Sequence, residues 1–369
     1  MKTYRNLYNQ LCSYDNLRLA WTKARQRKTQ KDYVVEFESN LEGNLKELQY
    51  ELETQIYSPA PLTVFIVRDP KTRKISASHF RDRVVHHALC NIIAPIFEKD
   101  FIHDSFANQK GKGVHMAIRR LEKFIRNVRF AAPVGGGGAQ KLLFGKQETL
   151  GYALKADIKH YFDTVDHAVL LNIIEKKIKD EKTLWLIKTI LSNHKVDASG
   201  KGMPIGNLTS QFFANVYLNE LDHFVKHALR AKYYLRYVDD FTILHRDRTT
   251  LELWKEEIGN FLDAELKVKL HPEKSRIIPL EQGITMLGFR IFYHYRLLKK
   301  SNARRIWKRL ERFKQKYDNG ELTSEEANRS MEGWIAYAKF ANTYNFRQSV
   351  SSRFSDLFSP ARTGRRTSA

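Results

Sequence analysis

The chain has 369 residues, and its 42% hydrophobic and 12% aromatic content excludes a wholly disordered protein. Lysine and arginine outnumber aspartate and glutamate by 63 to 41, and the resulting net charge of +22 favours a polyanionic partner such as nucleic acid. The sequence has no apolar run long enough to span a bilayer, no signal-peptide core, and only two cysteines, so we expect a soluble cytoplasmic protein that does not bind a membrane.

Residues 1–150 are expected to be mostly helical, with one β-rich run. Helical spacing covers residues 15–57, a short strand covers 62–67, and a basic turn with Lys71, Arg73 and Lys74 follows. Two further helices are predicted, over 80–101 and after Gly111-Lys112-Gly113, and Gly135 to Gly138 indicate a flexible loop.

Residues 151–298 mix strands with helices, and residues 299–369 are helical and basic before a tail with the composition of disorder from Pro360. This pattern predicts an α+β fold in three parts, 1–150, 151–298 and 299–369. Within the middle part, strands are expected over 151–158, 234–237, 241–244, 276–278 and 286–292, and helices over 168–191 and 210–229.

Three aspartates stand at ends of these strands. Asp157 ends the first strand, and Asp239-Asp240 fall in the tight turn between two others. Taken alone, an Asp-Asp pair usually indicates a solvated turn, and a single Asp at a strand end is usually a cap. Together, the three could hold two Mg²⁺ ions, with Mn²⁺ as a possible substitute, and such a pair of ions suits phosphoryl transfer.

The sequence around these aspartates resembles two motifs of reverse transcriptases, namely Arg236 to Phe241 and Ala156 to Asp163. The resemblance implies that Asp157, Asp239 and the Ile158 carbonyl are metal ligands, with Asp240 as a less direct one. It also implies that Phe162 is the aromatic gate that excludes a ribose 2′-hydroxyl, although a core aromatic is an alternative reading. The implied fold is a right-hand polymerase: N-terminal helices and fingers (1–150), an antiparallel-sheet palm (151–298), and a helical basic thumb with the C-terminal tail (299–369).

The segment after the basic turn resembles the fingers of group II intron reverse transcriptases, through Phe80 to Leu89, Pro95 to Glu98 and Ser105 to Asn108. The resemblance implies that Lys71 and Arg73 contact the incoming triphosphate, where cations offset the negative charge. A merely solvated basic loop is the alternative.

The loop from Gly202 to Gln211 distinguishes subfamilies. Most reverse transcriptases have a glutamine before the central glycine and a proline after the serine, whereas this chain has Ile205 before Gly206 and Gln211 after Ser210. This pattern resembles the enzymes of diversity-generating retroelements, which copy a template RNA with frequent errors opposite adenine. An apolar Ile205 removes a hydrogen bond to the nucleotide, which would weaken discrimination. The alternative is that this segment is only a loop followed by a helix, with Thr209 or Ser210 as the N-cap.

Three downstream features resemble further family motifs. Lys274, in Leu270 to Ser275, is a candidate general acid near the leaving pyrophosphate, or simply a surface lysine. Gly288, in Met286 to Phe289, would belong to a strand that grips the primer end. A basic helix suits contacts with a phosphate backbone, although such helices are often only solvated, and its residues are Arg304, Arg305, Lys308 and Arg309.

These features together predict an RNA-directed DNA polymerase that makes cDNA from a template-repeat RNA in a bacterial or phage diversity-generating retroelement (mutagenic retrohoming). Expected partners are template RNA, cDNA or primer, deoxynucleoside triphosphates and a small basic oligomeric accessory protein. A group II intron or retron enzyme is one alternative, although the residues after the expected thumb leave no room for a maturase domain. A basic RNA-binding protein whose polymerase site is dispensable is the other.

Overall fold

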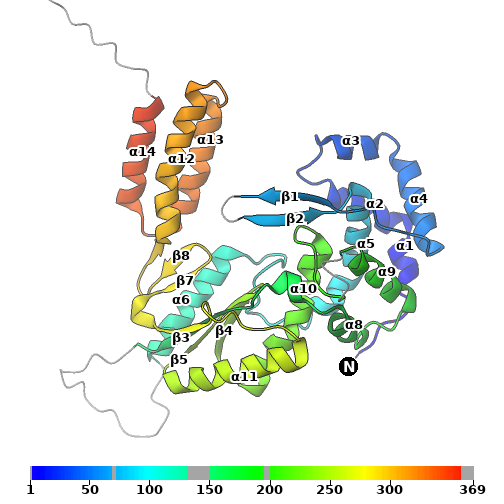
Figure 1. Cartoon of the computed structure of the whole chain (residues 1–369), viewed down its shortest axis with the longest axis horizontal. Coiled ribbons are helices and arrows are strands. Elements are labelled where there is room, and N and C mark those ends of the chain that lie inside the picture. The colour runs from blue at the N-terminus through cyan, green and yellow to red at the C-terminus, as the bar shows by residue number, and fades with distance from the viewer. Residues whose placement is uncertain (1, 69–71, 131–149, 195–199, 359–369) are drawn as a thin grey trace, which may run out of the picture. The chain divides into compact units, whose positions relative to one another are not determined.

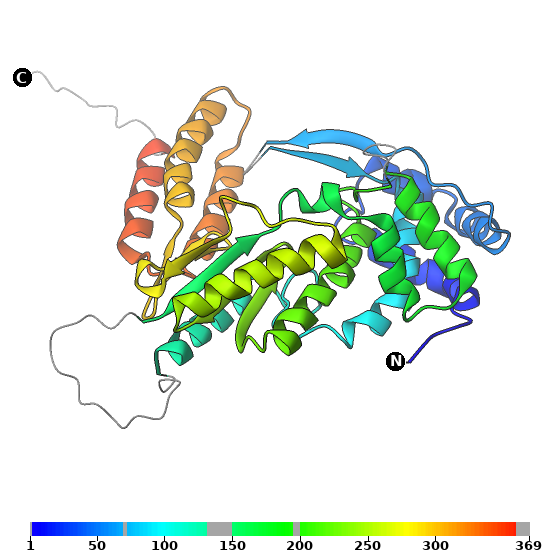
Figure 2. The ribbon, with the colours of Figure 1, turned by 60° about the horizontal axis from the view of Figure 1, so that its bottom comes forward.

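The computed structural model describes residues 2–68, 72–130, 150–194 and 200–358 (Figures 1 and 2). Lys71, the loop Gly135 to Gly138 and the tail from Pro360 lie outside these residues. The chain forms two compact units, Met1–Gly113 with Leu154–Ile277 and Val114–Ala153 with Ile278–Ala369. Both units combine helices with antiparallel strands, so the predicted α+β class is confirmed.

Helix α5 is the centre of the helical part of the first unit. It packs against α2, α10 and α1, and its apolar residues Val84, Val85, Leu89 and Ile93 are fully buried. The helices of this part are α1 (Tyr8–Cys12), α2 (Tyr14–Ala24), α3 (Asp32–Glu38), α4 (Leu41–Glu53) and α5 (Phe80–Glu98).

Strands β1 (Thr63–Val67) and β2 (Arg73–Ala77) form a separate two-stranded ribbon (Figure 1). Every residue of β1 is exposed, because a two-stranded sheet has little to pack against. The base of the ribbon is tied to a distant loop: the Ser76 amide donates to the Ile205 carbonyl at 3.0 Å, and the Ser78 amide donates to Asn207 Oδ1 at 3.1 Å. The ribbon is therefore anchored beside the loop from Gly202 to Gln211, which distinguishes subfamilies in the sequence.

A four-stranded sheet with the order β4-β5-β3-β6 forms the other part of this unit. Helix α11 packs on β5 (Figure 2), and α10 continues into the π-helical turn η1. The elements are β3 (Tyr152–Asp157), α7 (Tyr161–Thr164), α8 (His167–Glu175), α9 (Glu181–Ser192), α10 (Leu208–His223), η1 (Phe224–Ala228), β4 (Tyr233–Tyr237), β5 (Asp240–His245), α11 (Arg248–Leu266) and β6 (Arg276–Pro279).

Three local predictions in this unit were wrong. The helix expected over 168–191 is two helices, because Asp180 accepts the Thr183 amide at 2.9 Å and starts a new one. The helix expected from Ser210 starts at Leu208 after Asn207, whose side chain bonds the Ser78 amide instead of capping. Asp240 is the first residue of β5 opposite Tyr237, so the turn consists of Val238 and Asp239 rather than the two aspartates.

The second unit combines a small antiparallel sheet, β7-β8-β9, with helix α6 and a group of three helices, in which α14 packs on α12 and on α13 (Figure 1). The strand expected over 286–292 is interrupted, because Leu287 and Gly288 both have a positive φ and form a turn between β7 and β8. The elements are α6 (Val114–Phe130), η2 (Leu280–Gln282), β7 (Ile284–Met286), β8 (Phe289–Ile291), β9 (Arg296–Leu298), α12 (Lys300–Asp318), α13 (Ser324–Ala338) and α14 (Tyr344–Phe358). None of the described helices combines the length and the apolar character needed to cross a bilayer.

Candidate active site

The end of β3 meets the β4–β5 hairpin of the same unit. The Ile158 amide donates to the Asp239 carbonyl at 3.3 Å, so the residue after Asp157 touches the turn that carries Asp239. Asp240 follows in β5, the strand next to β3 in the sheet. The three aspartates predicted from the sequence therefore come from two adjoining strand ends.

A second segment, His271 to Ser275, holds Asp157. The His271 amide donates to the Asp157 carbonyl at 2.7 Å, and Ser275 Oγ lies 3.3 Å from the same oxygen. Lys274 Nζ donates to Asp157 Oδ1 at 3.1 Å. The predicted general acid Lys274 thus lies beside the predicted metal ligand.

The electrostatics of the hairpin favour a cation. Burial, and next the negative charge of Asp157, raise the pKa of Asp239 to about 6. Burial also raises the pKa of Asp240, while the ammonium of Lys155, 3.1 Å from Asp240 Oδ2, opposes that rise. Asp240 Oδ1 is buried and has no hydrogen-bond partner among the described residues, which is costly for a carboxylate.

These side chains suit Mg²⁺ but do not enclose it. No three His, Cys, Asp or Glu side chains within the described ranges are grouped closely enough to chelate one ion unaided. Mg²⁺ commonly takes one or two carboxylates and completes its shell with water and substrate phosphates. The unpartnered Asp240 oxygen and the carboxylates around it therefore fit an ion that is completed by a nucleotide.

Lys155 was not identified from the sequence. It lies two residues before Asp157, so the alternation of side chains puts both on the same face of β3. A lysine in that position of a strand that ends in an aspartate was the available signal, and it is weak because lysines are frequent in this basic chain.

Phe162 and the loop from Gly202 to Gln211 are brought together. The Met203 amide donates to the Phe162 carbonyl at 2.6 Å. Gly206 has φ +122°, and a Cβ at this position would lie 2.9 Å from Ile75 Cγ2 on β2, so only glycine fits here without strain. Ile205, which lies between Met203 and Gly206 in the sequence, is half-buried.

A cavity of about 510 Å³ opens between this loop, the β1–β2 ribbon and helix α5. Its size is in the range of small-ligand pockets. Its lining mixes aromatic, apolar, cationic and amide groups, among them Tyr33, Phe65, Ile75, Arg83, Gly206 and Gln211. Arg73 is exposed on β2, and the structure gives it no hydrogen bond or ion pair with a described residue of the site.

The remaining predicted residues belong to the second unit. Gly288 has φ +90°, and its carbonyl accepts from the Lys299 amide at 2.9 Å and the Tyr337 hydroxyl at 3.2 Å, so it joins the β7–β8 turn to α12 and α13. Arg304, Lys308 and Arg309 are exposed on α12, Arg305 is half-buried, and Arg309 also bonds Ser330 Oγ.

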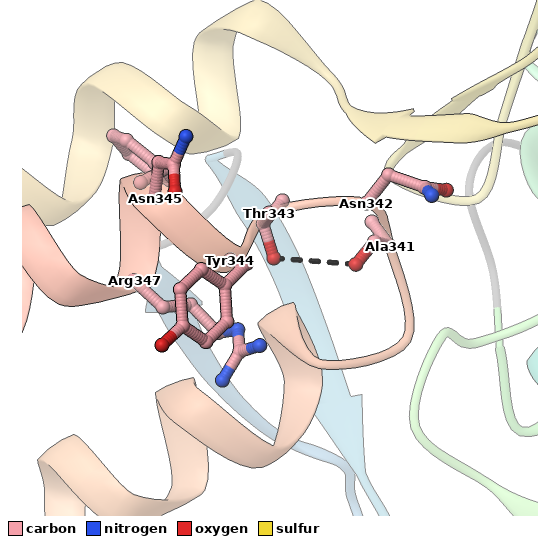
Figure 3. Close-up of a pocket in the computed structure, with 7 residues that line it drawn as sticks. Ala341, Asn342, Thr343, Tyr344, Asn345 and Arg347 are labelled. Carbon is pink, nitrogen blue, oxygen red and sulfur yellow. Dashed lines mark hydrogen bonds between the residues drawn. The ribbon is translucent and has the colours of Figure 1, made fainter.

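The second unit also has a cavity of about 410 Å³ where α13 turns into α14 (Figure 3). It is lined by Ala341 to Arg347, and the Thr343 hydroxyl donates to the Ala338 and Ala341 carbonyls. No carboxylate lines this cavity, so it lacks the groups for metal-assisted chemistry.

Comparisons with known proteins identify one matching family model and several similar proteins. A family model described as reverse transcriptase (RNA-dependent DNA polymerase) matches residues 68–291. Protein YkfC of Escherichia coli K12 is 26% identical over 295 residues, with 69% of this chain and 72% of YkfC covered. Group II intron-encoded protein LtrA of Lactococcus lactis subsp. cremoris is 24% identical over 320 residues, but the chain covers only 50% of LtrA. Apo telomerase of Candida tropicalis matches with a TM-score of 0.46 at 13% identity, over 68% of this chain and 59% of that chain.

Proposed function

The chain belongs to the reverse transcriptase family of RNA-dependent DNA polymerases, and we propose that Asp157, Asp239 and Asp240 are the carboxylates with which it extends a DNA primer on an RNA template. The observation that carries this proposal is the 3.3 Å hydrogen bond from Ile158 to Asp239, since it joins the two strand ends that bear the aspartates.

In the proposed reaction, the primer 3′-hydroxyl attacks the α-phosphate of a deoxynucleoside triphosphate, and pyrophosphate leaves. Two Mg²⁺ ions, or Mn²⁺, bound by Asp157, Asp239 and the Ile158 carbonyl would stabilise the charge on the attacking and leaving oxygens. Asp240 would be a less direct ligand beside them, and it is itself oriented by Lys155. Lys274, beside Asp157, is the proposed proton donor to the pyrophosphate.

The other predicted contacts surround the nucleotide in this proposal. Phe162 is the gate against a 2′-hydroxyl, and its bond to Met203 connects it to the Ile205–Gly206 loop. Lys71 and Arg73 would bind the triphosphate. The cavity beside Gly206 and Gln211 offers aromatic and cationic groups to the single-stranded template.

Primer extension on an RNA template with Mg²⁺ tests the proposal. The wild-type chain should extend the primer, and Asp157→Asn or Asp239→Asn should abolish extension. Asp263→Asn, an exposed aspartate on α11, is the matched control and should keep wild-type activity. Undiminished synthesis by either active-site variant would refute the site.

We further infer that the chain belongs to the diversity-generating type, which makes cDNA from a template-repeat RNA with errors opposite adenine. Ile205 and Gln211 support this subtype, because most of the family has a glutamine and a proline at these two positions. The apolar Ile205 also removes an amide that could bond the nucleotide. A structured template RNA and a small basic accessory protein are the partners that this subtype implies.

The error spectrum tests the role of Ile205. Ile205→Gln should lower misincorporation opposite template adenine, because the new amide can bond the incoming nucleotide. Ile205→Leu, which also lacks an amide, should keep the errors. Equal spectra for the glutamine and leucine variants would remove this role from Ile205.

A group II intron-like activity is the second candidate, supported by the match to LtrA. The chain covers half of LtrA, so the match supports the polymerase part only. Stimulation by the parent intron RNA rather than by a template-repeat RNA would favour this candidate over the diversity-generating type.

A further inference from the structure

The turn that carries Asp239 has an unfavourable backbone conformation. Val238 and Asp239 form a two-residue connection between the paired residues Tyr237 and Asp240. Val238 has φ +56°. Of the described non-glycine residues with a positive φ, it is the only one that is branched at Cβ. Hairpin turns of this length favour glycine or asparagine where φ is positive, since a branched Cβ collides with the backbone. A neighbouring group must therefore hold this turn.

Arg236 is that neighbour. Its side chain is fully buried, at 0% exposure, and all five of its N–H donors have an acceptor. Two bonds go to Asp222, from Nε to Oδ1 at 2.7 Å and from Nη2 to Oδ2 at 2.6 Å. Nη2 also donates to Ser105 Oγ at 3.2 Å, and Nη1 donates to Asn215 Oδ1 at 3.2 Å. The fifth bond, from Nη1 to the Val238 carbonyl at 3.0 Å, reaches the turn.

The acceptors are fixed in turn by other elements of the same unit. The Tyr234 hydroxyl donates to Asp222 Oδ1 at 2.6 Å, and Asn215 Nδ2 donates to the Ala107 carbonyl at 2.8 Å. The Arg236 backbone is paired on both sides, with the Asp104 carbonyl at 2.9 Å and the Phe106 amide at 3.0 Å. A buried network in which every donor is satisfied has one arrangement and resists rotation of its members.

We propose that Arg236 is a positioning residue, which grips the Val238 carbonyl and thereby holds Asp239 against the end of β3. This inference rests on the proposed function, because Arg236 has value for catalysis only if Asp239 does. Arg236 contacts no expected substrate, and it acts through the turn.

The variant Arg236→Lys tests the bond to the Val238 carbonyl separately from the ion pair with Asp222. A lysine keeps a positive charge near Asp222, but its three donors and single ammonium cannot reproduce the planar fork that also reaches Val238. We expect kcat for primer extension to fall about 10-fold to 100-fold, as small displacements of catalytic groups do, while KM for the nucleotide changes less than about twofold. Arg25→Lys, which alters a bidentate pair with Glu38 in the helical part, is the control and should keep wild-type kcat.

Val238→Asn provides the decisive rescue. Asparagine adopts a left-handed conformation with less strain than valine, so the turn needs less support. The double variant Arg236→Lys/Val238→Asn should regain a large part of the lost kcat. Because the asparagine also relieves strain in the fold, kcat is expressed per folded enzyme and Tm is measured beside it. Absence of rescue in kcat would overturn the inference.

Amide hydrogen exchange gives a readout that does not need activity. Arg236→Lys should accelerate exchange across 238–240 and leave 153–157 unchanged, and equal exchange in the turn would overturn the inference. If the wild-type chain extends no primer, the proposed function fails. Hydrogen exchange alone then decides whether Arg236 holds the turn. If Arg236→Lys does not fold, Ser105→Ala removes one acceptor while keeping the ion pair, and the same local acceleration is expected.

Discussion

Single residues around the aspartates balance their charge. Lys274 pairs with Asp157 and Lys155 pairs with Asp240, each at 3.1 Å. A lysine that occupies a carboxylate oxygen competes with a metal ion for it. The two ion pairs therefore make a prediction about metal binding that needs no polymerase assay.

Lys155→Met should make the chain more responsive to Mg²⁺. Without the ammonium, the mostly buried Asp240 loses its compensating charge, and the free energy of unfolding should fall by about 1–3 kcal/mol. Mg²⁺ then replaces the missing charge, so the rise in Tm on adding Mg²⁺ should be larger than in wild type. Differential scanning calorimetry with and without Mg²⁺ measures both effects.

The control for this effect is Lys176→Met, which removes an exposed lysine paired with Glu220 on α10. It should show the wild-type response to Mg²⁺. An equal rise in Tm for Lys155→Met and wild type would mean that Lys155 does not compete with the ion.

The sequence could predict which residues belong to the site, but it could not predict the contacts that position them. Asp157 and Asp239 were singled out because the aspartates at strand ends could together hold metal ions and because they match family motifs, and their roles remain predictions. The contacts of Arg236 were beyond prediction, because its acceptors Asp222, Asn215 and Ser105 are distant in sequence and only the fold brings them together.

Among the elements, helix α5 carries two histidines, His86 and His87, which should destabilise the folded chain in acid. His86 is 4% exposed, and its Nδ1 has no hydrogen-bond partner among the described residues. Burial lowers the pKa of His86 to about 3, and burial together with the charges of Lys28 and Lys23 lowers the pKa of His87 to about 4. Both histidines must therefore be neutral in the folded chain at neutral pH.

The free energy of unfolding should fall as the pH drops below the unfolded histidine pKa. The unfolded chain takes up these protons from about pH 6.5 downward, whereas the folded chain does not until about pH 4 for His87 and pH 3 for His86. Between pH 7 and pH 5, His86 alone should remove about 2 kcal/mol, and urea unfolding at pH 7, 6 and 5 measures this loss. His86→Phe should show a shallower dependence.

His103→Phe controls for the removal of any histidine, because the His103 side chain is 72% exposed. His103 contacts Asp104 at 3.1 Å, but His86 is intact in this variant, so the loss of stability between pH 7 and pH 5 should remain. A dependence as steep in His86→Phe as in wild type would show that His86 takes up its proton in the folded chain as well.

Element types were easier to predict from the sequence than element limits. The strand Thr63–Val67 follows from its run of β-branched and aromatic residues, and the helix Phe80–Glu98 follows from the helical spacing of its apolar residues. The breaks do not, because they depend on local bonds: Asp180 caps α9, and Leu287 and Gly288 adopt positive φ in a turn. The beginning of α10 was misplaced because the Asn207 side chain bonds the distant Ser78 amide.

At the scale of the whole molecule, the net charge of +22 implies an affinity for nucleic acid that depends strongly on salt. Each lysine or arginine that contacts a phosphate releases about one counterion on binding. The charge alone does not say which cations make contact, whereas the exposed face of α12 offers Arg304 and Lys308 one helical turn apart.

Arg304→Gln/Lys308→Gln should reduce the slope of log affinity against log salt by about 2 on an RNA–DNA duplex, because two phosphate contacts are lost. The loss of affinity should be equal for duplexes of different sequence, since backbone contacts carry no base information. Lys46→Gln/Lys188→Gln removes the same charge from two exposed lysines that pair with Glu42 and Glu175, and it should leave the slope nearly unchanged. Fluorescence anisotropy from 50 to 300 mM KCl, roughly the range in which such contacts weaken, measures all three slopes. Identical slopes for the two double variants would mean that α12 contributes only to the overall charge and does not contact the phosphates.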